Sequence, residues 1–316
     1  MNDLGSRTSS SQTPGRASIW WQAIRPRTLA AGAAPVLVGT ALAVADGVFH
    51  PWAALFALAG ALALQIATNI HNDYEDYVRG ADGPDRVGPK RATAEGWVAP
   101  ETVRRAAIGV FLAAIVIGVY LVARGGPPIL ALGLASVAAG YSYTGGPKPL
   151  AYVGLGDLFV LIFFGFAAVV GTYYVQALQT CPAAWWLGLG VGLLSTAILA
   201  VNNLRDHQSD SAAGKRTLAV RFGTRVARLE YTLCLALAYL ALAPATLAGH
   251  PGVLLGLLSL PAARTVHNTV MSREGAALGP CLGATAKLLA RYGALISAGL
   301  GIEALLRAAW QALFGG

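Results

Sequence analysis

The sequence predicts an all-α membrane protein with about nine transmembrane helices. Of its 316 residues, 55% are hydrophobic and 12% are charged, and the mean hydropathy is +0.57. An ordinary soluble domain has roughly 25% charged residues, so the composition argues against that class. Long apolar runs recur along the chain, and most approach the roughly 20 residues that a helix needs to cross a bilayer.

The expected spans lie near 29–46, 52–71, 106–123, 128–143, 156–175, 185–201, 229–248, 252–264 and 288–306. The eighth is the shortest, so a count of eight stays open. Residues 1–19 are polar and rich in Ser and Thr, and we expect a disordered cytoplasmic tail there. The transmembrane domain is expected to cover residues 20–316.

The distribution of basic residues predicts the orientation. With the N-terminus inside, the nine spans place every Lys and Arg except Arg124 and Arg307 on the cytoplasmic side, as the positive-inside rule requires. The same rule accounts for the net charge of +8, because the basic residues are spread over loops instead of lining one face. We therefore expect a multi-pass protein of the inner (cytoplasmic) membrane that contacts the lipid bilayer and does not bind nucleic acid.

Two polar segments that read alike each follow an apolar run, one from Asn69 to Asp82 and the other from Asn202 to Arg216. If each continues the preceding helix, Asn69, Asp73 and Asp76 share one face, and Asn202, Asp206 and Asp210 form one stripe. Carboxylates at the ends of membrane helices are costly unless they bind something. Helix capping explains one or two such residues but not two matching clusters.

The residue types favour Mg²⁺ that carries a phosphate, because the ligands are hard oxygen atoms. The Asp and Asn side chains of the two stripes are the candidate ligands. Lys215 and Arg216 follow the second stripe, where fixed positive charge can neutralise a leaving diphosphate. We call the polar segment 69–82 the first motif and the polar segment 202–216 the second motif. Both motifs are expected to face the cytoplasm.

The two segments resemble the two signatures of the UbiA superfamily of intramembrane aromatic prenyltransferases. Similar stretches occur at 25–29, 143–149, 154–157 and 163–165, and the resemblance covers roughly residues 20 to 225. The general superfamily spacing places an acid where this chain has Gly80. The branch that uses 1,4-dihydroxy-2-naphthoate shows that glycine too, with its acid two residues later, here at Asp82.

The resemblance implies a helical bundle around a central cavity with both motifs at its cytoplasmic end. It implies Mg²⁺ ions that bridge the protein to a polyprenyl diphosphate. Their ligands would be Asn72, Asp76 and either Asp82 or Asp73 on one side, and Asp206 and Asp210 on the other. The expected catalytic residues are Asp76, Asp206, Asp210, Lys215, Lys148 and Tyr143. The expected substrate-binding residues are Arg25, Asn69, Asn72, Asp73, Asp157, Asn202, Asn203, Arg205 and Arg216.

The reaction expected from the resemblance is polyprenyl transfer to 1,4-dihydroxy-2-naphthoate with release of diphosphate and CO₂, which gives demethylmenaquinol for menaquinone biosynthesis. Another aromatic acceptor, such as 4-hydroxybenzoate, stays open. So does a secondary transporter, because transporters also place Asp and Asn at helix breaks. Arg25 can act as a head-group anchor, and Lys148 can merely follow the positive-inside bias.

Overall fold

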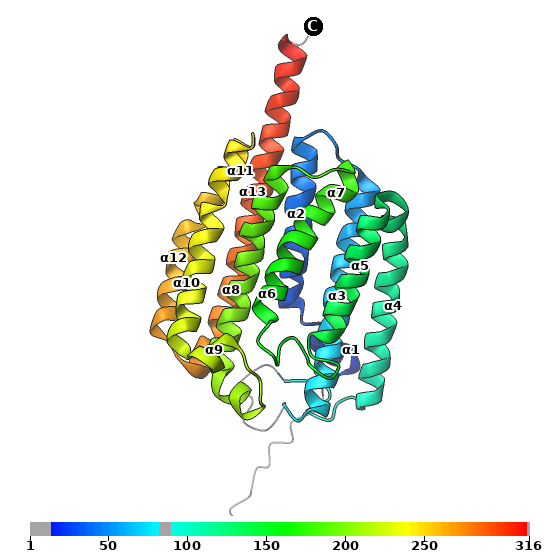
Figure 1. Cartoon of the computed structure of the whole chain (residues 1–316), viewed down its shortest axis with the longest axis vertical. Helices are drawn as coiled ribbons and strands as arrows, with labels where there is room; N and C mark the ends of the chain where they lie inside the picture. The colour runs from blue at the N-terminus through cyan, green and yellow to red at the C-terminus, as the bar shows by residue number, and fades with distance from the viewer. Residues whose placement is uncertain (1–13, 82–89, 315–316) are drawn as a thin grey trace, which may run out of the picture.

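The computed structural model describes residues 14–81 and 90–314, and every regular element in these residues is a helix. The helices stand side by side in an elongated bundle (Figure 1). The C-terminal ends of α3 (Pro51–Val78) and α8 (Pro182–Ala212), which carry Asp76 and Asp210, lie at one end of the bundle, the lower end in Figure 1, which we call the motif end. The C-terminal helix projects from the opposite end, which we call the far end. The all-α fold class is therefore confirmed.

In chain order the helices are α1 (Arg16–Ile24), α2 (Pro26–Ala45), α3 (Pro51–Val78), α4 (Pro100–Gly125), α5 (Pro127–Ser142), α6 (Gly156–Val160), η1 (Leu161–Val170), α7 (Gly171–Ala177), α8 (Pro182–Ala212), α9 (Leu218–Phe222), α10 (Thr224–Leu240), α11 (Leu242–Leu247), η2 (Pro251–Ser259), α12 (Leu260–Ser272), η3 (Gly275–Leu278) and α13 (Gly279–Phe314). Several begin with proline, which suits the first helical position because the N–H group it lacks would have no partner there. α1 begins upstream of residue 20, and residues 1–13 of the expected tail lie outside the described residues.

Among the described residues, seven segments are long and apolar enough to cross a membrane. One of them, Pro100–Ser142, contains both α4 and α5, which turn at Gly126 with a φ of +69°. The eighth expected span falls on η2 and α12, which are not among the seven. Every expected span thus coincides with a helix, whereas the count of nine crossings is approximate.

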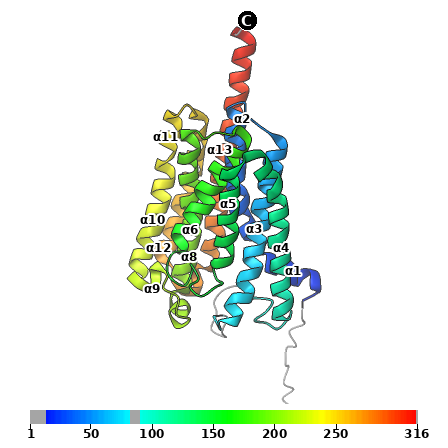
Figure 2. The same ribbon diagram turned by 45° about the vertical axis from the view of Figure 1, so that its right-hand side comes forward.

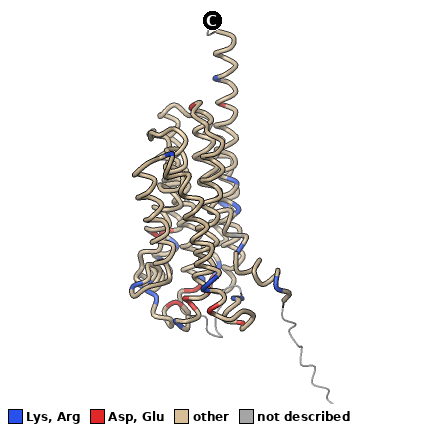
Figure 3. Tube along the Cα trace, turned by 90° about the vertical axis from the view of Figure 1, so that its right-hand side faces the viewer, with Lys and Arg blue, Asp and Glu red and all other residues tan. Residues whose placement is uncertain are grey.

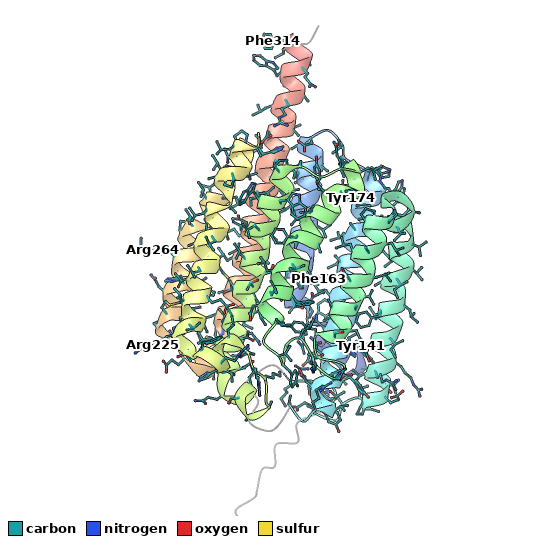
Figure 4. All side chains as sticks on the ribbon, viewed as in Figure 1. Tyr141, Phe163, Tyr174, Arg225, Arg264 and Phe314 are labelled. Atoms are coloured by element: carbon teal, nitrogen blue, oxygen red, sulfur yellow. The ribbon has the colours of Figure 1, made fainter. Side chains whose placement is uncertain are left out.

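The helical segments α6, η1 and α7 follow one another without a break, and this continuous helix packs closely against α8. Its middle segment, η1, is a π-helix, a form that is frequent at functional sites. A Cβ atom on Gly165 would lie 2.5 Å from the carbonyl oxygen of Gly188 on α8, so only glycine permits this approach. Phe163 of η1 lies about half way along the bundle, well above Tyr141 (Figure 4).

The main apolar core joins α2, α8, α10 and α13, with Leu42, Leu194 and Tyr231 fully buried among them. At the far end, Arg307 of α13 donates hydrogen bonds to the carbonyl oxygens of Ala45 and Gly249, where α2 and α11 end. The C-terminal end of α13 projects from the bundle (Figure 2). Acidic residues gather mainly at the motif end (Figure 3), so the ends of the bundle differ in chemistry.

Candidate active site

The first motif forms the motif end of α3, where Asn72, Asp73 and Asp76 are buried. Asn72 and Asp76 are one helical turn apart and therefore share a face. The Oδ1 atom of Asn72 accepts a hydrogen bond of 2.6 Å from the hydroxyl of Thr144, which follows α5. The helix thus presents one amide and one carboxylate in a fixed orientation.

Asn69 lies two turns before Asp76 and connects α3 to the junction of α1 and α2. Its Nδ2 atom donates to the carbonyl oxygen of Ile24 at 2.9 Å and to the hydroxyl of Thr28 at 2.8 Å. Between these two residues, Arg25 adopts a left-handed backbone conformation with a φ of +55°. Such a conformation costs a non-glycine residue of order 1–3 kcal/mol. Asn69 therefore holds the strained turn that places Arg25 at the cavity described below.

The second motif forms the motif end of α8. Arg205 holds Asp206 with two hydrogen bonds, of 2.6 Å from Nε and 2.5 Å from Nη2, and the same Nη2 atom donates to Asn202 at 2.9 Å. This bidentate pair fixes the orientation of the carboxylate and stabilises its negative charge. Asp210 lies one turn further on and is buried.

Lys215 joins the two motifs. Its ammonium nitrogen lies 3.7 Å from Oδ1 of Asp76 and 3.5 Å from Oδ1 of Asp210. The turn after α8 brings it back, since its backbone N–H donates to the carbonyl oxygen of Asp210 at 2.8 Å. Carboxylates from helices far apart in the sequence therefore face one point.

Arg91 and Tyr152 complete the surroundings of Asp76. Nη2 of Arg91 lies 2.7 Å from Oδ2 of Asp76, and its Nη1 donates to the backbone oxygen of Asn72 at 2.5 Å. The hydroxyl of Tyr152 donates to Oδ1 of Asp76 at 3.0 Å, and its ring lies 5.1 Å from the Lys215 ammonium. Burial, and then the Asp76 charge, raise the pKa of Tyr152 well above its usual value, so this hydroxyl remains a donor at neutral pH.

Asp73 has a different environment from Asp76. Its carboxylate accepts hydrogen bonds from the backbone N–H groups of Ala92, at 3.1 Å, and Thr93, at 3.4 Å, and from the Thr93 hydroxyl. These contacts satisfy the buried carboxylate and anchor the loop that carries Arg91. The structure therefore shows Asp73 fixing a loop, and we do not retain it as a proposed metal ligand.

Both motifs lie at the polar end of a cavity of about 1690 Å³. This volume exceeds the roughly 300–1,000 Å³ of ordinary ligand pockets. Its walls toward the middle of the bundle include Phe159, Phe163, Phe164 and Ala167. A cavity with an anionic, hydrogen-bonding end and long apolar walls suits an amphipathic ligand with a charged head and an apolar chain.

A second polar group in the cavity wall contains Tyr143 and Asp157. Asn203 Nδ2 donates to Oδ1 of Asp157 at 3.4 Å. Burial, and then the negative charge of Asp157, raise the pKa of Tyr143 well above its usual value. The Tyr143 phenol therefore remains protonated at neutral pH and can donate a hydrogen bond.

The cavity brings together most of the residues predicted from the sequence. Its lining includes Arg25, Asn69, Asn72, Asp73, Asp76, Tyr143, Asp157, Asn202, Asn203, Arg205, Asp206, Asp210 and Lys215. Lys148 and Arg216 are exposed and do not line it, because the loops that carry them direct both side chains elsewhere. Asp82 lies outside the described residues.

Among the residues described above, sequence reasoning missed three with specific contacts, Arg91, Thr144 and Tyr152. Arg91 belongs to a Lys-Arg pair shortly after the first motif. Two adjacent basic residues so close to a cluster of acids could have indicated a partner for those acids. Tyr152 and Thr144 carry no such signal, because they reach Asp76 and Asn72 through the path of the loop between α5 and α6.

The donor chemistry fits Mg²⁺, since Asn72, Asp76, Asp206 and Asp210 offer only hard oxygen atoms. Asp76 and Asp210 already share one cation, the Lys215 ammonium, and so face a common point. In residues 14–81 and 90–314, however, no three His, Cys, Asp or Glu side chains are grouped closely enough to bind a metal by themselves. A metal here would take ligands from both motifs and from a substrate.

Sequence comparison connects the chain to a known family. The model of the UbiA prenyltransferase family matches residues 33–277. The 1,4-dihydroxy-2-naphthoate octaprenyltransferase of Escherichia coli is 43% identical over 230 residues, 71% of this chain and 74% of that protein. Proteins of the same name from Mycobacterium tuberculosis and Bacillus subtilis are 40% and 31% identical, over 81% and 94% of this chain and 87% and 96% of their own lengths.

Solved structures show the same fold. A UbiA homolog from Archaeoglobus fulgidus bound to DMAPP and Mg²⁺ has a TM-score of 0.61 at 16% identity, over 88% of this chain and 99% of that one. The apo UbiA homolog from Aeropyrum pernix K1 has a TM-score of 0.66 at 16% identity, over 85% and 97% of the two chains. With its apolar helices, the chain is a multi-pass membrane protein that belongs to the UbiA prenyltransferase family.

Proposed function

We propose that this protein transfers a polyprenyl group from polyprenyl diphosphate to 1,4-dihydroxy-2-naphthoate in a Mg²⁺-dependent reaction. The products are demethylmenaquinol, diphosphate and CO₂. The names and the 31–43% identities of the relatives support this acceptor. The solved homologs with DMAPP or GPP and Mg²⁺ support a prenyl diphosphate donor and a divalent metal.

The observation that carries the proposal is the convergence of Asp76, Asp210 and Lys215 at the polar end of an apolar cavity. When bound, Mg²⁺ supplies positive charge that stabilises the diphosphate as the allylic C–O bond breaks. Asn72, Asp76, Asp206 and Asp210 would hold it. The apolar walls would accommodate the polyprenyl chain and exclude water from the allylic cation.

A cation at the same end would bind the leaving diphosphate, and the neighbouring donors would hold the two motifs in place. Lys215 is the cation placed between the two motifs, and it stabilises negative charge that develops during bond breaking. The Tyr152 hydroxyl remains protonated and holds the orientation of Asp76. Arg91 and Arg205 each already hold a carboxylate, so they act mainly by fixing the motifs.

The acceptor would lie toward Arg25, Tyr143 and Asp157, which line the same cavity. The planar guanidinium of Arg25 matches a carboxylate. The acceptor carbon that bears the carboxylate would attack the allylic carbon, and loss of CO₂ would restore aromaticity. We place the motif end in the cytoplasm, at the inner membrane, because the basic loops require that side.

The test is prenyl transfer by purified protein with labelled polyprenyl diphosphate, Mg²⁺ and a panel of acceptors. We expect 1,4-dihydroxy-2-naphthoate to be preferred over 4-hydroxybenzoate and homogentisate, and EDTA to abolish transfer until Mg²⁺ is restored. Preference for another acid would overturn the proposed acceptor. Undiminished transfer in excess chelator would overturn the role of the metal.

A further inference from the structure

A pair of acids lies inside the membrane-spanning part of the bundle, apart from the carboxylates that surround Lys215. Asp157 on α6 is 8% exposed and lines the cavity, whereas Glu230 on α10 does not line it. The two carboxyl groups lie within hydrogen-bonding reach of each other. Acids within membrane helices are expensive and indicate function by default.

A hydrogen bond between them requires a proton, because two ionised carboxylates offer only acceptor atoms. Oε2 of Glu230 is buried and accepts no hydrogen bond from any N–H or O–H group in the part of the chain that the structure describes. Asp157 accepts one from Asn203 at 3.4 Å. Since a buried charge needs donors and a neutral acid does not, the proton belongs on Glu230 and the negative charge on Asp157.

Within residues 14–81 and 90–314, the surroundings of the pair provide no counter-charge. No cation is among the groups that act on either carboxyl in the described residues, and the titratable neighbours are Tyr143 and Cys234. Tyr143 stays protonated, and a thiol is largely neutral at pH 7 because its ordinary pKa is about 8.5. The O–H group of Glu230 and the amide of Asn203 are therefore the side-chain donors that stabilise the Asp157 carboxylate, beside its own backbone N–H group.

We propose that Glu230 is a positioning residue that, as a neutral acid, donates a hydrogen bond to Asp157 and keeps this carboxylate ready to accept the hydroxyl proton of the aromatic acceptor. Asp157 is then a catalytic residue, and Glu230 acts only through it. The inference rests on the proposed function, because it assigns the proton acceptor for that reaction.

The step balances without an added reactant. The acceptor O–H bond breaks and its proton passes to Asp157, while ring electrons form the bond to the allylic carbon and diphosphate departs with the electrons of the C–O bond. When CO₂ leaves, the electrons of its C–C bond return to the ring, and Asp157 returns the proton to the oxygen. The acid pair begins and ends in the same state.

The kinetic test compares Glu230→Leu with Glu230→Gln. Loss of the donor in Glu230→Leu should lower kcat about 10- to 100-fold, the usual worth of a hydrogen bond to a charged group. It should also move the acidic limb of the kcat/KM profile for the acceptor to higher pH, because a less stabilised carboxylate is protonated more easily. The KM for polyprenyl diphosphate should not change.

The amide of Glu230→Gln can still donate a hydrogen bond, so this variant should restore most of the activity and the wild-type pH profile. Asp157→Asn should be inactive, because an amide cannot accept the proton. Wild-type kinetics for Glu230→Leu, or equal losses for the Leu and Gln variants, would overturn the proposed role.

Infrared spectroscopy of the purified protein locates the proton without any substrate. We expect a carboxylic-acid C=O stretching component at pH 7 that Glu230→Gln removes and Asp157→Asn retains. The opposite pattern would place the proton on Asp157 and contradict the proposal. A wild-type enzyme that prefers another phenol would refute the proposed acceptor and leave this result unaffected, so the two failures are distinguishable.

Discussion

Nη2 of Arg91 lies 2.7 Å from Oδ2 of Asp76, and both side chains are buried. The same guanidinium donates to the backbone oxygen of Asn72, one turn earlier on α3. A residue of the loop after the first motif therefore binds both ends of the helical turn that presents the Asn72 and Asp76 side chains. The loop and the motif are one structural unit.

Arg91→Ala should disrupt this unit, because removing one partner of a buried ion pair costs about 3–5 kcal/mol. We expect turnover to fall at least roughly tenfold and chymotrypsin to cleave more rapidly at Trp97 in the same loop. The matched control is Arg104→Ala, since Arg104 is exposed and pairs with Glu101, which is also exposed. Unchanged turnover and cleavage in Arg91→Ala would contradict this account.

Asp76→Asn and Asp210→Asn should each lower turnover by at least about 100-fold, because an amide cannot neutralise Mg²⁺ or balance Lys215. Both variants should insert and purify normally, and both should need more Mg²⁺ for half-maximal rate. Glu101→Gln, an exposed acid on α4, is the control. If both amide variants turned over at the wild-type rate, the acids would be no more than helix caps.

Ala167→Leu should narrow the cavity beside Phe163. Overpacking a cavity wall excludes a long chain more than a short one, so kcat/KM for a long polyprenyl diphosphate should fall at least roughly tenfold, against about threefold or less for dimethylallyl diphosphate. Ala131→Leu is the control, because Ala131 is exposed and does not line the cavity. Equal losses for long and short donors would show that the chain binds elsewhere.

The orientation is tested with single cysteines in a variant whose Cys181, Cys234 and Cys281 are replaced by serine. A cysteine at Ala94, exposed at the motif end, should react with a membrane-impermeant thiol reagent only after the cytoplasmic side is opened. A cysteine at Thr180, exposed at the far end, should react from outside. The reverse pattern would invert the topology and deny the site its cytosolic acceptor.

Much of the fold could be predicted from the sequence because span length and basic loops report directly on the bilayer. Each expected span coincides with a helix, and the family is confirmed. The number of crossings could not be predicted as well, because the eighth expected span falls on two shorter helices, η2 and α12, which are not among the seven long apolar segments of the described residues. The π-helix η1 could not be predicted, because no local pattern in its apolar residues signals it.

The acids of the site could be predicted because residues one turn apart on a helix share a face, as Asn72 and Asp76 do. The partners from loops could not, because the contact between Tyr152 and Asp76 depends on the path of the loop before α6. Lys148 was expected at the site, but its side chain is exposed outside the cavity. Its position also depends on the path of this loop.

The central claim is tested most directly by prenyl transfer to 1,4-dihydroxy-2-naphthoate labelled in its carboxyl group. If the prenyl group attaches to the carbon that bears the carboxylate, labelled CO₂ should appear in step with demethylmenaquinol, one for each product molecule. A 4-hydroxybenzoate transferase would instead lose a ring proton and keep the carboxylate. A prenylated product that retains the label would contradict the proposed reaction.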